Sequence, residues 1–299
     1  LGIAPQPMRG LPPLWTHVSV RPFMYLFNFA WAHLGFTVFR FVNILLGSAV
    51  PCLVFALSVR MRATPCVAVC VALLACLHPQ LVLFSAIGFP EMLATTLLLC
   101  GLLTYLSNST RWATVFLCLT VLAKEAFAMF LVPLLVDGFV ALLRTRKKLV
   151  FAPIVGLVAI TLTNSFEIYF LHGPPQGWSH NKIGDEFYGH FFWTYWFLPF
   201  GLLLLLHRQY RLLLLGLGAP AFFFVWGNVM KKGVDSWYII GPFSVALVPI
   251  TVALQQAVDT LKTPSWSSRA GDGLSRTDWL KTSRSFCAVA TILSLMFAP

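Results

Sequence analysis

Charged residues are scarce in this sequence. Asp, Glu, Lys and Arg together make up 10% of its 299 residues, whereas 58% are hydrophobic, and the mean hydropathy is +0.80. In soluble domains about a quarter of all residues are charged, so this chain lacks the polar surface needed to cover a globule in water. The composition therefore predicts an integral membrane protein.

Motifs of soluble enzymes are absent as well. The sequence contains no P-loop and no G-x-G-x-x-G, G-x-S-x-G or H-E-x-x-H motif. Its seven cysteines form no C-x-x-C pair and lie in apolar runs, which indicates buried side chains rather than a zinc site or a disulfide framework. The net charge of +11 does not indicate a nucleic-acid partner, because Lys and Arg lie mainly in short connections between apolar runs.

Apolar runs of membrane-spanning length recur along the chain, since about 20 residues cross the hydrocarbon layer. We predict an all-α, polytopic transmembrane protein with about ten short spans, at 41–60, 66–86, 91–106, 112–123, 126–143, 150–172, 191–206, 212–230, 237–257 and 284–298. One transmembrane domain, 1–299, is expected. It divides into an exoplasmic or interfacial segment (1–40), a membrane core (41–257), a cytoplasmic connection (258–283) and a last span (284–298).

The apolar run 112–143 decides the topology. Its 32 residues would form a helix of about 48 Å, too long for one ordinary span. A turn at Lys124-Glu125 divides it into two short helices and brings both charges to a membrane face. With this turn, 14 of the 21 basic residues fall on one side, which the positive-inside rule makes cytoplasmic.

Two sites at the opposite, exoplasmic face could carry chemistry. Lys124 could hold an anionic headgroup or phosphate as a point charge, and Glu125 could tune Lys124 or meet a substrate hydroxyl. Equally, the two could form a simple turn whose charges reach water. Glu91, in the first turn of its span, could serve in catalysis or sugar binding, or only complement the helix dipole.

The exoplasmic connection 173–190 combines acids with aromatic side chains. Asp185 and Glu186 lie near Trp178, Tyr188 and His190, a mixture that suits carbohydrate binding because sugars present both hydroxyls and apolar C–H faces. A divalent cation, Mg²⁺ or Mn²⁺, could bridge the two acids and a phosphate. A plain solvated loop is the alternative.

A third exoplasmic cluster contains Lys231 and Lys232 next to Trp237 and Tyr238. The lysines could anchor the helix at the interface, or bind the phosphate of a lipid-linked substrate.

The order of these features resembles the GT-C membrane glycosyltransferases, of the mannosyl- or arabinosyltransferase kind. The likeness rests on Arg21-Pro22-Phe23-Met24-Tyr25 followed by Gly35, Arg40, Asn43 and Gly47, on His78-Pro79 through Glu91, on Arg111-Trp112 to Pro133 around Leu122-Ala123-Lys124-Glu125, and on Asp235 to Pro249. It is more specific over 21–143 than over 150–257.

The resemblance implies an enzyme that takes a sugar from a polyprenyl-phosphate donor at the exoplasmic face, with Lys124 near the donor phosphate. Arg21 stands where the family often has His or Pro, and joins Lys124, Lys231 and Lys232 as a candidate for phosphate binding. The candidate catalytic acids are Glu91, Glu125, Asp185 and Glu186. We expect at least two of them to line one exoplasmic cavity with Lys124.

One family feature is missing from the sequence. The catalytic acid of these enzymes typically precedes the Pro-x-Tyr segment, but residues 1–20 contain no Asp or Glu. Three interpretations stay open: an N-terminally incomplete chain, which the first residue, Leu1, favours; an acid elsewhere in the chain; or lost activity.

Two other functions fit a polytopic protein. A transporter or lipid flippase would place its charges at mid-membrane, whereas here they gather at one face. A non-catalytic subunit of a membrane complex would need no catalytic acid. For any of the three, we expect a multi-pass protein of a bacterial inner membrane or the endoplasmic reticulum.

The predicted topology can be tested at a glycosylation sequon. Asn108-Ser109-Thr110 lies in a connection that the charge distribution makes cytoplasmic, where no glycan is added. Expression in a eukaryotic host should leave Asn108 unmodified, as judged by mass spectrometry. A glycan on Asn108 would contradict this topology.

Overall fold

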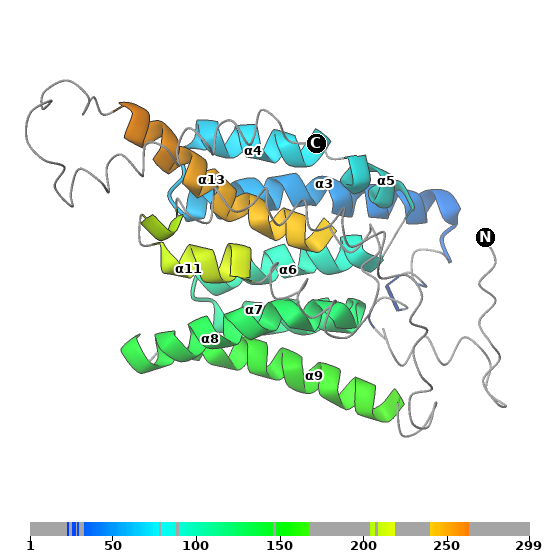
Figure 1. Cartoon of the computed structure of the whole chain (residues 1–299). Coiled ribbons are helices and arrows are strands. Elements are labelled where there is room, and N and C mark those ends of the chain that lie inside the picture. Colours follow the sequence, from blue (N-terminus) through cyan, green and yellow to red (C-terminus); the bar gives the residue numbers. More distant parts are fainter. Residues whose placement is uncertain are drawn as a thin grey trace, which may run out of the picture.

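The computed structural model describes residues 23, 26, 27, 29, 33–77, 79–87, 90–145, 148–167, 204–206, 209–218 and 240–262. These residues form a bundle of helices, and no strand occurs among them (Figure 1). The all-α prediction is confirmed for this part of the chain.

The helices lie side by side along one axis (Figure 1). Their bounds are α3 (Phe36–Arg60), α4 (Pro65–Leu77), α5 (Pro79–Ile87), α6 (Pro90–Leu106), α7 (Thr110–Ala123), η1 (Glu125–Phe127), α8 (Ala128–Thr145), η2 (Lys148–Val150), α9 (Phe151–Glu167), α11 (Tyr210–Leu212), the π-helical η4 (Leu213–Gly218) and α13 (Ile240–Lys262). α4 and α5 both pack against α3, α6 packs between α3 and α7, and α9 packs against α7 and α8. α13 closes the bundle by packing on α3, α4 and α6.

In the part of the chain that the structure describes, three helical stretches are long and apolar enough to cross a membrane: Phe36–Arg60, Glu125–Thr145 and Gly241–Asp259. Large apolar side chains also project outward from the bundle, including Phe36, Leu77, Leu143 and Leu162, which are 66–76% exposed. Such surfaces are unfavourable in water but suit contact with lipid. The structure thus supports a membrane protein.

Prolines explain several helix boundaries. Pro65, Pro79 and Pro90 begin α4, α5 and α6, because proline lacks the N–H that the first helical position leaves unused. The predicted span 66–86 therefore contains two helices, since Pro79 starts a second one. The break inside 112–143 is confirmed by the end of α7 at Ala123 and the start of η1 at Glu125.

Other predicted spans lie wholly or partly outside the described residues. These are 191–206, 212–230 and 284–298, together with the polar connection 258–283. The number of spans stays a prediction.

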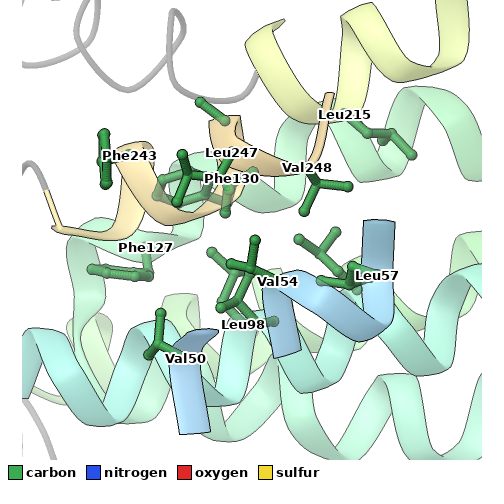
Figure 2. Close-up of a cluster of buried hydrophobic side chains, with 14 of the residues drawn as sticks. Val50, Val54, Leu57, Leu98, Phe127, Phe130, Leu215, Phe243, Leu247 and Val248 are labelled. Carbon is green, nitrogen blue, oxygen red and sulfur yellow. The ribbon is translucent and has the colours of Figure 1, made fainter. Parts of the chain in front are cut away.

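One part of the hydrophobic core lies where α13 meets α3 and α6. Figure 2 shows Val50, Val54 and Leu57 of α3 facing Leu247 and Val248 of α13, with Leu98, Phe127, Phe130, Leu215 and Phe243 completing the cluster. Every one of these side chains is buried. A helix from the last fifth of the chain therefore joins the first spans into one core.

Polar contacts fix α13 in this position. Ser58 Oγ donates to Thr251 Oγ1 at 3.0 Å in the interior, and Thr64 Oγ1 donates to Gln255 Oε1 at 2.5 Å. Hydrogen bonds between buried hydroxyls are characteristic of helix contacts in membranes.

Charges are divided between the two ends of the bundle. Among the described residues, the end that holds the α3–α4, α6–α7 and α8–η2 connections carries Arg60, Arg62, Arg111, Arg144, Lys148, Arg211 and Lys262 (Figure 1). The opposite end, where α3, α6 and η1 begin, carries Arg40, Glu91, Lys124 and Glu125. The helix directions thus bring together the connections that the sequence assigns to one face.

Among the described glycines, Gly138 of α8 lies closest to the backbone of a neighbouring element. A Cβ at this position would lie 2.7 Å from Val150 Cα and 2.9 Å from Val150 N. At Gly156, the nearest atom would instead be Leu131 Cδ1, at 2.7 Å. The first obstacle belongs to the backbone of η2, whereas the second is the end of a flexible side chain.

We expect Gly138→Ala to lower the free energy of unfolding by about 1–3 kcal/mol, because η2 must shift to admit the methyl group. Gly156→Ala is the matched control and should change it by less than about 1 kcal/mol, because Leu131 can rotate and alanine favours the helix. Denaturant unfolding of the purified protein in mixed micelles measures both. Equal losses in the two variants would contradict this packing.

Candidate functional site

Lys124 marks the break between α7 and α8. Its backbone is extended (φ −151°, ψ 112°), so the residue leaves the helix although apolar sequence continues on both sides. Its N–H still donates to Thr120 O at 3.0 Å, and its carbonyl accepts from the N–H of Phe127 at 3.1 Å. These two bonds join α7 directly to η1 and fix the position of the lysine.

The lysine side chain meets Glu91 of α6. Lys124 Nζ lies 2.8 Å from Glu91 Oε1, and the two side chains are only 4% and 1% exposed. The turn predicted at Lys124 is therefore present, but the interpretation in which Lys124 reaches water was wrong. Packing of α6 against α7 buries the lysine beside the acid that opens α6.

The pair is held by charge more than by aligned hydrogen bonds. Neither carboxylate oxygen of Glu91 has a hydrogen bond of good geometry within the described part of the chain, although Oε1 is at ion-pair distance from Lys124. Burying two ions costs several kcal/mol each before their attraction offsets it. Glu91 Oε2 thus keeps acceptor capacity inside the bundle.

Glu125 is the other predicted acid that the structure describes. It opens η1 directly after Lys124 and is half-buried. The structure therefore brings Glu91 and Lys124 into contact and places Glu125 next to them in sequence. The remaining candidates lie outside the described residues: Arg21, Trp178, Asp185, Glu186, Tyr188, His190, Lys231 and Lys232.

The expectation of a shared cavity stays a prediction, since two of its four acids are not described. The same holds for a divalent cation bridged by Asp185 and Glu186. Within the described ranges, no three His, Cys, Asp or Glu side chains gather as metal ligands.

A second buried acid, Asp137, was missed from the sequence. Arg211 holds it with two hydrogen bonds, Nε to Oδ1 and Nη2 to Oδ2, both at 2.9 Å. Tyr105 OH donates to Asp137 Oδ2 at 3.0 Å and approaches Leu134 O at 3.2 Å. An acid inside the apolar run 126–143 was the available signal, because such a residue needs a partner.

This network links α6, α8 and α11 near the basic end of the bundle. The Arg211 side chain is 47% exposed, against 9% for Asp137, so solvent weakens the attraction between them. A bidentate Arg–carboxylate pair also fixes orientation. We interpret it as a structural clamp that positions α11 and η4 against α8.

Comparison with protein-family models, curated proteins and solved structures finds no match to this chain. The assignment of a function therefore depends on the site itself and on the sequence motifs described above.

The Glu91–Lys124 pair should behave as one energetic unit. Glu91→Gln or Lys124→Met alone leaves a buried charge without its partner, which we expect to lower the free energy of unfolding by about 3–5 kcal/mol. The double variant should cost clearly less than the sum, as a double-mutant cycle in mixed micelles would measure. Lys148→Met, at an exposed lysine of the opposite end, serves as the control and should change the free energy of unfolding by less than about 0.5 kcal/mol. Additive losses at Glu91 and Lys124 would show that the contact contributes nothing.

Proposed function

We propose that this protein is an integral membrane glycosyltransferase that transfers a sugar from a lipid-phosphate-linked donor to an acceptor hydroxyl at the exoplasmic face. The observation that carries the proposal is the buried Glu91–Lys124 pair at the break between α7 and α8. The resemblance of the surrounding motifs to GT-C enzymes supports it.

The position of the pair favours chemistry over simple packing. An ionisable pair inside an apolar bundle is costly, and apolar side chains of similar volume often stabilise such a position equally well. The opposite end already collects the exposed basic side chains that would orient the protein in a membrane. Membrane orientation therefore does not explain why Glu91 and Lys124 are buried together at this end.

An anion is electrostatically favoured beside Lys124. The lysine supplies a point charge, and α6, α8 and α13 are among the helices that begin at this end of the bundle (Figure 1). Helix N-termini carry partial positive charge and attract phosphate, although α7 ends here and partly offsets it. A donor phosphate that approached Lys124 would compete with Glu91 for the ammonium group.

That competition would release a base where it is needed. As the acceptor oxygen attacks the anomeric carbon, the bond from that carbon to the phosphate oxygen breaks and its electron pair stays on the phosphate. The acceptor proton passes to the Glu91 carboxylate, while Lys124 stabilises the charge on the leaving phosphate. Before the donor binds, the ion pair keeps both groups neutralised.

A non-catalytic subunit of a membrane complex is the second candidate. The observation that favours it is the engagement of Glu91 by Lys124, because a carboxylate that stays in a salt bridge is a poor base. On this interpretation the pair would serve only to join α6 to the α7–α8 turn.

The enzyme function can be tested by supplying polyprenyl-phosphate-mannose or polyprenyl-phosphate-arabinose as donor and a membrane extract as the source of acceptor. The measurement is the release of polyprenyl phosphate. We expect the double variant Glu91→Gln, Lys124→Met to fold but to lose activity by about 10²-fold or more, the usual contribution of a general base. Lys148→Met, at an exposed lysine of the opposite end, should keep full activity. An active double variant would contradict the proposed function, and inactive wild-type protein with both donors would favour the subunit.

A further inference from the structure

Ten Ser and Thr hydroxyls of these helices, some buried and some exposed, share one pattern. They donate to the carbonyl of the residue four positions earlier in their own helix, which satisfies the hydroxyl without another partner. This bond is made by Ser48, Ser85, Thr96, Thr104, Thr114, Thr120, Thr145, Thr161, Thr163 and Thr251.

Thr95 of α6 and Ser244 of α13 depart from that pattern. Each is 0% exposed, yet neither hydroxyl has a hydrogen-bond partner within the described part of the chain. A buried hydroxyl without a partner is unfavourable, and in a native protein it indicates a bound water, an ion or a ligand. Both side chains forgo a bond to their own helix that their neighbours make.

The two hydroxyls belong to the seam where α6 meets the start of α13. Thr95 lies one turn after Glu91 on the same face of α6, and its Oγ1 is 3.5 Å from where a Cβ on Gly241 would lie. Ser244 follows Gly241 by about one turn of α13. Glu91 Oε2, also without a hydrogen bond among these residues, completes a short polar line beside Lys124.

An aromatic ring borders this line. A Cβ on Gly241 would come within 2.6 Å of Phe127 Cζ, and Figure 2 shows Phe127 beside the start of α13. The seam thus offers one carboxylate acceptor, two hydroxyls that both donate and accept, and the apolar edge of an aromatic ring. Vicinal hydroxyls with C–H faces match this set, whereas a second anion would be repelled by Glu91.

We propose that Glu91 Oε2, Thr95 and Ser244 form a subsite that binds sugar hydroxyls. This inference rests on the proposed function and deepens it, by separating sugar recognition at the α6–α13 seam from phosphate recognition at Lys124. Since Thr95 and Ser244 are sealed from solvent, the ligand reaches them when the start of α13 parts from α6.

The ligand-free protein provides the first test. Thr95→Val keeps the shape of the side chain and removes a hydroxyl that has no partner, so Tm should stay unchanged or rise. Thr251→Val is the matched control. Its equally buried hydroxyl donates to Leu247 O at 2.8 Å and accepts from Ser58, so its loss should lower Tm by about 2–4 °C. A drop of similar size in Thr95→Val would overturn the proposal, because it would reveal a structural partner such as an internal water.

Lipid-induced stabilisation provides the second test. Polyprenyl-phosphate-mannose or polyprenyl-phosphate-arabinose should raise the Tm of the wild type more than polyprenyl phosphate does. Thr95→Val and Ser244→Ala should lose that difference but keep the rise caused by polyprenyl phosphate, while Thr251→Val keeps both.

Each other outcome has a distinct meaning. If the difference survives in Thr95→Val and Ser244→Ala, or if the sugar adds nothing in the wild type, the subsite is overturned while phosphate binding stands. If none of the lipids raises the Tm of the wild type, the proposed function fails and the subsite fails with it.

Discussion

The buried contact between Glu91 and Lys124 is the constraint on which the rest of the site depends. It joins the first turn of α6 to the point where α7 ends, and thereby fixes where a long apolar run is divided into two helices. Without a partner for Lys124, a charge at this position would be costly inside the bundle. With Glu91 in place, the turn, the start of α8 and the seam with α13 can all pack at one end.

Separation of charge gives the bundle two different ends. Exposed Arg and Lys side chains gather at the end with the α3–α4 and α8–η2 connections, where the one buried acid of α8, Asp137, is held by Arg211. The other end buries Glu91 and Lys124 and leaves two hydroxyls without a hydrogen-bond partner among the described residues. The first arrangement suits orientation in a membrane and the second suits a ligand, which is why both proposals concern the same end.

Sequence reasoning predicted the helical class, the break at Lys124 and the opposed ends, because these follow from run length and charge position. It missed the pairing of Glu91 with Lys124, since helix contacts between residues 33 positions apart leave no periodic signal. Asp137 was overlooked within an apolar run, although its isolation was informative. The unsatisfied state of Thr95 and Ser244 could not be predicted at all, because it depends on side-chain rotation and not on composition.

A structure of the protein with polyprenyl phosphate bound would test the central claim most directly. We expect the phosphate at Lys124 Nζ, with Glu91 displaced from its present 2.8 Å contact. A phosphate bound among the arginines of the opposite end, with Glu91 and Lys124 still paired, would contradict it.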